Sequence, residues 1–211
     1  MLKKIEKIAK GLIILSLVGI FVAMTAGEPV YGDVTVSATV ASMISCTTPL
    51  TSSDFGTIDN TAVFQSSPIA TTTVNSNGQV YMKVYDVGVP TVTTKPGLYC
   101  SACPGTDDEK TIGSADSAYA DTATLSAGTE GYGLQATTSA SNNLKISTRF
   151  ATTSANYVGG LEASSTNAVT VASSSAAVSG EVVTTPLRAA VSASQAQGSY
   201  SDTITFVCSS T

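Results

Sequence analysis

Four cysteines are the residues of this chain with the clearest chemistry. Cys46 and Cys208 stand far apart in the sequence, whereas only two residues separate Cys100 from Cys103. In an exported chain, four cysteines predict two disulfides. For the closer pair, a redox motif and a metal site are the alternatives. A Cys-x-x-Cys redox motif needs a helix N-terminus, which the sequence does not show, and a zinc site needs two more ligands.

Side-chain parity predicts which cysteines pair. Cys46 has the parity of Ile44, and Cys208 has that of Phe206, so both are expected on the inner faces of their strands. The first and last strands of a sandwich are often neighbours. We therefore expect a Cys46–Cys208 bond, and a second bond between the two remaining cysteines across the tight turn that separates them.

The composition excludes several kinds of catalytic centre. The chain has no His, which removes Ser-His-Asp and Cys-His systems and every His-ligated metal site. It has 15 acidic and 10 basic residues and a net charge of −5, which disfavours phosphate-driven binding of nucleic acids. We expect no enzyme activity, no cofactor and no nucleic-acid partner.

Acidic side chains offer two further chemistries. Paired carboxylates could serve a glycosidase, but the candidates sit in no recognisable motif. Oxygen ligands could bind Ca²⁺, but their spacing fits no EF-hand loop, and solvated loop acids are the simpler interpretation. The glycosidase candidates are Asp54, Asp59, Asp86, Glu130, Glu162 and Glu181. The calcium candidates are Asp107, Asp108, Glu109, Asp116 and Asp121.

Tyrosines could form a face that binds sugar or protein, although packing within strands is the simpler interpretation. These tyrosines are Tyr81, Tyr85, Tyr99, Tyr119 and Tyr132.

The first 32 residues predict a secretory signal peptide. The first ten residues are basic, and residues 11–26 form an apolar run shorter than a bilayer requires. Cleavage could follow Ala26 or Gly32. Gly32 is preferred because Val30-Tyr31-Gly32 puts small residues at both recognition positions and the strand pattern starts at once. A type IV pilin leader is the alternative, but Ser16 stands where its acidic residue is expected. We expect a secreted or cell-surface protein that meets the membrane only before cleavage.

Residues 33–211 predict a single all-β domain, an antiparallel Ig-like β-sandwich. Apolar and polar residues alternate in several short runs that are rich in Val and Thr and separated by turn signals. The expected strands are residues 34–41, 55–58, 69–75, 80–86, 133–138, 144–148, 168–172, 181–194 and 204–208.

Two segments depart from this pattern. Residues 88–131 contain three prolines and the closer cysteine pair, and they predict a long insertion over one end of the sandwich. Residues 163–180 are rich in Ser and Ala, which predicts a weak edge hairpin or a flexible segment.

Short motifs at both ends of the domain carry a family resemblance. Ser45-Cys46 followed by Phe55-Gly56-Thr57-Ile58 resembles the start of pilin-type sandwiches of the spore coat protein U and chaperone–usher kind. The run 197–206, with Tyr200 and Asp202, resembles their closing strand, and the run 128–134 resembles unassigned secreted sandwich proteins of small-genome bacteria. The resemblance implies a pilin-like fold.

Simple physical roles suit the residues of these motifs. Phe55 is expected to anchor the core, and Gly56 to permit a close backbone approach or a bulge. The Tyr200 hydroxyl is expected to bond to backbone at a sheet corner.

The resemblance to pilins favours an exported structural or adhesive protein, with a filament subunit as one form of it. In that form, residues 33–42 act as a donated strand between copies, because Val34, Val36, Ala38 and Val40 present one apolar face. The simpler interpretation is that this strand pairs within its own sandwich. The alternative function is a module that binds glycan or cell wall, so the expected partners are a second copy, a surface glycan or a protein ligand.

Overall fold

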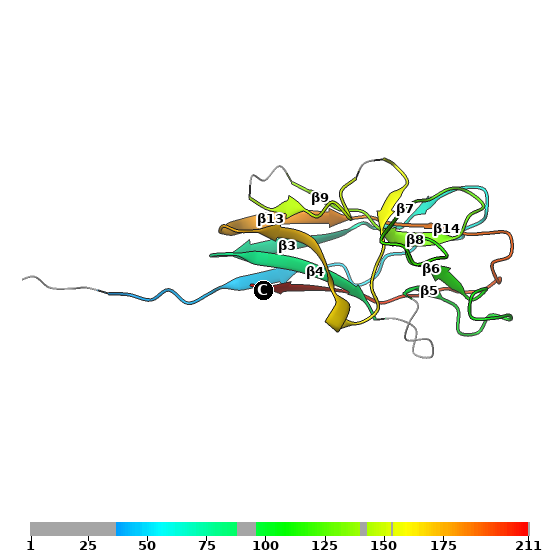
Figure 1. The fold of residues 1–211 in the computed structure, drawn as a ribbon, viewed down its shortest axis with the longest axis horizontal. Coiled ribbons are helices and arrows are strands. Elements are labelled where there is room, and N and C mark those ends of the chain that lie inside the picture. The colour runs from blue at the N-terminus through cyan, green and yellow to red at the C-terminus, as the bar shows by residue number, and fades with distance from the viewer. Residues whose placement is uncertain (1–36, 88–95, 140–142, 153, 211) are drawn as a thin grey trace, which may run out of the picture. The chain divides into compact units, whose positions relative to one another are not determined.

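The computed structural model describes residues 37–87, 96–139, 143–152 and 154–210. Within them, strands make up nearly all of the regular structure, and the one helical element is a 3-10 turn, η1 (Ser165–Asn167). No helix of the described residues is long and apolar enough to cross a membrane. The fold is an all-β antiparallel sandwich, as the sequence predicts (Figure 1). The expected signal peptide of residues 1–32, together with Val34 and Val36, lies outside the described residues.

The chain divides into two units, residues 1–40 and 41–211. Residues 37–40, the described part of the first unit, form no strand, and Val40 is exposed. The prediction of a strand over residues 34–41 is therefore wrong for this part. The first strand starts later because its partner ends at Ser76, and Asn77 closes the ladder by bonding to the backbone of Met43.

The described residues of the range 41–211 form three larger sheets and a hairpin, and every pair of named strands is antiparallel. The first sheet has the order β1 (Ile44–Thr47), β3 (Ala70–Ser76), β13 (Val178–Thr185) and β9 (Thr137–Thr138). The second has the order β10 (Lys145–Ile146), β12 (Val169–Ser174), β4 (Val80–Asp86) and β15 (Ile204–Ser209). The third has the order β2 (Phe64–Gln65), β14 (Leu187–Ala190), β8 (Gly131–Leu134), β11 (Tyr157–Gly159) and β7 (Thr122–Thr124). The hairpin pairs β5 (Gly97–Tyr99) with β6 (Thr111–Gly113).

The chain passes twice between the first and third sheets. β8 is followed closely by β9, and β13 is followed by β14 after the single residue Pro186. Proline has no N–H to donate to a ladder, so it suits the point where pairing changes partner. The Pro186 carbonyl still accepts the N–H of Gln135, which keeps the β8–β9 and β13–β14 segments aligned where they pass from one sheet to the other.

Alternation of buried and partly exposed side chains along the central strands builds the core between the sheets. Val80, Met82 and Val84 of β4 are fully buried, and the residues between them are partly exposed. This is the period of two that the sequence predicts for residues 80–86. Burial of such side chains is the main favourable term in folding. The largest fully buried side chains elsewhere are Tyr132, Phe150, Ile112, Leu134, Leu144 and Leu161.

The segment 88–131 is not simply a loop. Its described part, residues 96–131, supplies the β5–β6 hairpin and β7, and it enters β8.

The Ser- and Ala-rich segment 163–180 also differs from the prediction. β12 lies between β10 and β4, and β13 lies between β3 and β9, so neither is an edge strand. Small side chains suit these central positions because Val171, Ala172 and Ser174 are buried.

The predicted strand at residues 55–58 is absent. Asp54 makes a single antiparallel bridge to Ser67, after which Gly56 adopts a left-handed φ of +66° and ends the pairing. Nothing lies within 4 Å of the position where a Gly56 Cβ would stand, so this glycine serves the backbone turn and not a close approach. Phe55 does anchor the core, since its ring packs edge-on against Tyr132 with centroids 6.2 Å apart.

Both disulfides join the cysteines that the sequence predicts to pair, the first by parity and the second as the remaining pair across a tight turn. Cys46 on β1 is bonded to Cys208 on β15, with 5.9 Å between their Cα atoms, and so links the first sheet to the second. Cys100 and Cys103 are bonded across a turn, with 5.4 Å between Cα atoms. No cysteine is left free. Two such bonds fit an oxidising environment.

The two disulfides differ in how strongly they restrict the unfolded chain. The Cys46–Cys208 bond spans 162 residues of sequence and the Cys100–Cys103 bond spans 3. The chain-entropy relation gives about 5 kcal/mol for the long loop and about 2 kcal/mol for the short one. In denaturant titrations, Cys46→Ala/Cys208→Ala is therefore expected to lose more unfolding free energy than Cys100→Ala/Cys103→Ala. Equal losses would contradict the assignment of the long bond as the main covalent restraint.

Candidate functional site

A groove of about 520 Å³ runs between two segments that belong to opposite ends of the domain sequence. One wall is the segment 48–55, which follows β1, and the other is the segment 200–206, which enters β15. Between the walls the lining is mainly apolar. The residues between the walls are Ala70, Leu98, Tyr132, Leu134, Thr185 and Leu187.

β15 borders this groove at the edge of its sheet. The order of the second sheet places β15 last, with β4 as its only ladder partner among the described residues. Ile204 and Phe206 of β15 line the groove. The Cys46–Cys208 bond links β1 to β15 just beyond Phe206 along the strand. The groove therefore combines apolar side chains with an open strand edge.

Two carboxyl groups meet at this groove. Asp86, at the end of β4, is 0% exposed, and its carboxylate accepts the N–H of Gly97 at 2.6 Å. Asp202, which lines the groove, is hydrogen-bonded to Asp86. The Tyr132 hydroxyl donates to Asp202 at 3.0 Å, and the N–H of Thr203 donates to its other oxygen at 2.6 Å. A hydrogen bond between two carboxyl groups requires that one of them holds a proton.

Burial and the neighbouring Asp86 raise the pKa of Asp202 well above its ordinary value of 3.8. Burial, followed by the charge of Asp202, raises the pKa of Tyr132, which therefore stays a hydrogen-bond donor. The folded protein thus keeps a proton on Asp202 that the unfolded chain releases above about pH 4. The stability that this proton contributes is present at low pH and is lost as the pH rises through the raised pKa.

We expect the unfolding free energy of the wild type to fall as the pH rises from about 4. In Asp202→Asn the unfolding free energy should depend less on pH, because the amide donates to Asp86 at every pH in this range. Asp107→Asn, which removes an exposed carboxylate, is the matched control and should keep the wild-type slope. Urea titrations at several pH values measure these slopes. The same slope in all three proteins would show that Asp202 does not hold the proton.

A second hollow, which we call the loop pocket, adjoins the groove. It has a volume of about 800 Å³ and is formed by residues 54–60, residues 191–193 and 195–200, and Leu98. Asp54, Phe55, Leu98 and Tyr200 line both hollows and so form the wall between them.

The wall of the loop pocket that comes from residues 195–200 has no regular structure, yet it is held firmly. The Tyr200 hydroxyl donates to backbone oxygens, as the sequence predicts, at 2.6 Å to Ala196 and 3.1 Å to Glu109. The Gln195 amide donates to the carbonyls of Glu109 and Thr111. This part of the wall is thus fixed to the β5–β6 hairpin.

The Cys100–Cys103 disulfide packs against the same wall. A Cβ added at Gly198 would collide with Cys103 Sγ and lie 2.8 Å from Cys100 Sγ. Only glycine leaves room for the two sulfur atoms here, because a disulfide cannot swing aside as a long side chain can.

Gly198→Ala is therefore expected to cost about 1–3 kcal/mol of unfolding free energy through overpacking. Gly78→Ala is the control, since nothing lies within 4 Å of its added Cβ and its effect should be small. Thermal or chemical denaturation compares the two variants. Equal stability of the variants would show that the wall can move away from the disulfide.

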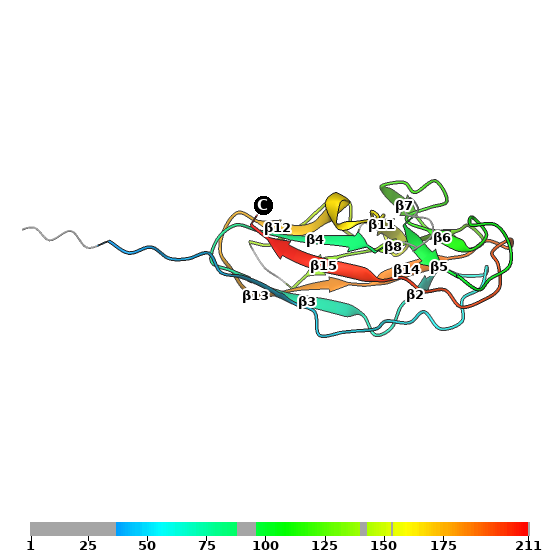
Figure 2. The same cartoon turned by 90° about the horizontal axis from the view of Figure 1, so that it is seen from below.

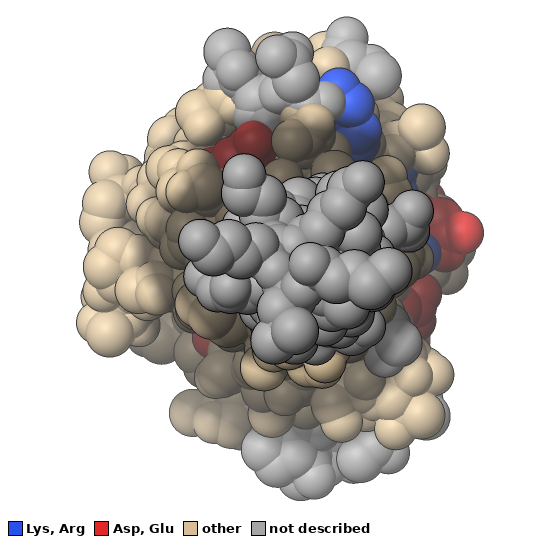
Figure 3. Space-filling view, turned by 90° about the vertical axis from the view of Figure 1, so that its left-hand side faces the viewer, with Lys and Arg blue, Asp and Glu red and all other residues tan. Residues whose placement is uncertain are grey.

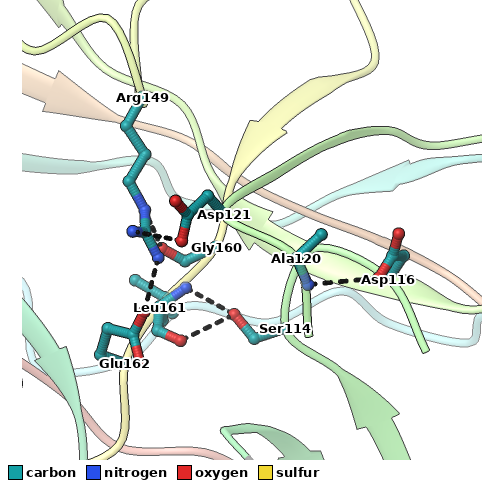
Figure 4. Close-up of polar contacts among 8 residues, drawn as sticks. All are labelled: Ser114, Asp116, Ala120, Asp121, Arg149, Gly160, Leu161 and Glu162. Carbon is teal, nitrogen blue, oxygen red and sulfur yellow. Dashed lines mark hydrogen bonds and ion pairs between the residues drawn. The ribbon is translucent and has the colours of Figure 1, made fainter. Parts of the chain in front are cut away.

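The acidic candidates mostly serve as structural acceptors. Arg149 donates to the Asp121 carboxylate at 2.9 Å, to Glu162 at 3.1 Å and to the Gly160 carbonyl at 2.9 Å (Figure 4). Asp116 accepts the N–H of Ala120 at 3.3 Å, which shapes a turn beside this group (Figure 4). The Glu109 carboxylate accepts the N–H of Thr106, which lowers its pKa, and Glu130 accepts the N–H of Gly113. Among the described residues, no three His, Cys, Asp or Glu side chains gather as metal ligands.

Of the predicted glycosidase candidates, Asp86 is hydrogen-bonded to a second carboxyl group, that of Asp202, which the sequence predicts only as part of a fold motif. Asp54 lines both hollows and Asp59 lines the loop pocket, whereas Glu181 lies on β13.

The tyrosines do not make one face. Tyr132 is buried, whereas Tyr81 and Tyr85 lie on the partly exposed side of β4. Tyr99 and Tyr119 come from the hairpin region and are partly buried. Phe55 and Tyr200 line both hollows, and of the five tyrosines only Tyr132 lines one of these two hollows, the groove. A face of five tyrosines is therefore not the binding surface.

The surface shows no concentration of basic side chains on the face drawn in Figure 3, where the described charged residues are few and scattered among uncharged ones. Comparison with family models, curated proteins and solved structures finds no match to this chain. The function must therefore be argued from the groove and the loop pocket themselves.

Proposed function

We propose that this protein is an exported, non-catalytic structural or adhesive protein of the cell surface, and that its copies join by strand donation. Residues 33–42 of one copy add to the free edge of β15 in the next copy and fill its groove. The observation that carries this proposal is the apolar groove of about 520 Å³ beside an edge strand.

An added strand needs main-chain hydrogen bonds and places for its side chains, and the groove offers both. The open edge of β15 supplies main-chain donors and acceptors, and apolar side chains such as Leu134 and Leu187 supply places for alternate side chains. At about 3.3 Å per residue, the wall of residues 200–206 is roughly 20 Å long. Alternate side chains on one face lie about 7 Å apart, so the wall accommodates about three of them.

The proposed donor has a matching pattern. Val34, Val36, Ala38 and Val40 recur every second residue, with Thr35, Ser37 and Thr39 between them. Residues 37–40 form no strand in the single chain, and Val40 is 81% exposed. An apolar side chain exposed to this extent gains free energy when a partner covers it.

The first test deletes residues 33–42 from the exported chain. Donation predicts a folded monomer that no longer assembles, because the deletion removes the added strand but none of the named strands of residues 41–211. A peptide of residues 33–42 should bind this monomer. Size-exclusion chromatography with light scattering measures the assembly, and circular dichroism measures the fold. An unfolded deletion variant of an otherwise monomeric protein would contradict donation.

A pair of matched variants tests which face enters the groove. Val36→Asp/Ala38→Asp places charge on the apolar face and should abolish assembly, because a buried unpaired charge is costly. Thr35→Asp/Ser37→Asp places the same charges on the opposite face and should preserve it. Loss of assembly in both variants would indicate that the added charges repel the partner copy, and it would contradict insertion of the apolar face into the groove.

A further inference from the structure

We infer that the loop pocket is a binding site for an uncharged carbohydrate. The inference rests on three features of the pocket: its construction, its charge and its polar and aromatic groups. It does not depend on strand donation, which uses the groove on the other side of the wall formed by Phe55, Leu98 and Tyr200.

The pocket is built where two long connections of the domain meet. Residues 48–63 join β1 to β2, and residues 191–203 join β14 to β15. Connections of this length without strands or helices of their own are uncommon in a compact domain and usually serve a function. In Figure 2 both connections reach the right-hand end of the domain, beside β2, β5 and β14.

Both connections are fixed before any ligand arrives. The first is tied by reciprocal backbone hydrogen bonds between Asp54 and Ser67, and the second by the Tyr200 hydroxyl and the disulfide packed on Gly198. Gly128 also bridges to Ser192. A preorganised pocket loses less conformational entropy on binding than a flexible loop does.

The charge of the pocket selects against anions. Asp54 and Asp59 are the charged side chains of the lining, and it contains no Lys or Arg. Phosphate, sulfate or carboxylate groups would meet two like charges with no basic partner. The Thr61 hydroxyl and N–H both donate to one oxygen of Asp59 and lower its pKa, so the Asp59 carboxylate remains an ionised acceptor.

The polar and aromatic groups suit a polyhydroxylated ring. Asp54 and Asp59 each use one oxygen in a local turn, and the Asn60 and Gln197 amides make no hydrogen bond within the described chain. Such groups donate to and accept from neighbouring hydroxyls. The half-buried rings of Phe55 and Tyr200 offer apolar surface to the C–H face of a sugar. The volume of about 800 Å³ lies in the range of small-ligand pockets.

The test is an NMR titration of the full exported chain with four uncharged oligosaccharides: maltotriose, cellotriose, mannotriose and N,N′,N″-triacetylchitotriose. We expect at least one of them to shift amide signals of residues 54–60 and 195–200 in a saturable way. Asp59→Asn/Gln197→Ala should weaken the dissociation constant of that sugar by about tenfold or more, since it removes a charge-assisted acceptor and an amide.

Two controls keep the result specific. Gln79→Ala/Asp107→Asn changes the same kinds of side chain outside the pocket and should bind as the wild type does. The deletion of residues 33–42 should also bind normally, which separates this inference from strand donation. The inference is overturned if none of the four sugars binds, if the shifts map elsewhere, if the pocket variant binds equally well, or if acidic oligosaccharides such as trigalacturonate bind more tightly.

Discussion

The hydrogen-bonded group of Asp86, Asp202 and Tyr132 is the interaction on which the groove depends, since Asp202 and Tyr132 line it. It joins the end of β4 and the segment that enters β15, both in the second sheet, to β8 of the third sheet. Asp86 also holds the start of β5 through Gly97. Removing one member would leave buried polar atoms without partners, which costs more than a hydrogen bond contributes. A proton shared between two carboxyl groups thus fixes where the groove lies relative to the core.

The sequence predicts the parts of the fold in which local pattern and tertiary packing agree. Residues 80–86 alternate with period two, and they form β4 over the same bounds. The parity of Cys46 and Cys208 predicts their bond because parity fixes the face of a strand. The strand predicted at residues 55–58 fails because the left-handed backbone of Gly56 overrides the apolar pattern of its neighbours.

The candidate site is predicted less well, for a physical reason. Asp86 and Asp202 come from distant parts of the chain, and no periodicity marks two acids that will share a proton. Likewise, Phe55 and Tyr200 are recognisable as anchors, but their common wall between two hollows depends on how two long connections fold. Loop paths follow from individual contacts such as Tyr200 to Ala196 and not from a repeating pattern.

The Cys46–Cys208 bond has a mechanical consequence for a filament built by donated strands. Tension enters each copy through its N-terminal segment and reaches Cys46 within a few residues. The covalent bond passes it directly to β15, the strand beside which the next donated strand would lie. The segment between the two cysteines, residues 47–207, is outside this direct covalent path. The strands other than β1 and β15 would then carry less of the load while the chain of subunits is stretched.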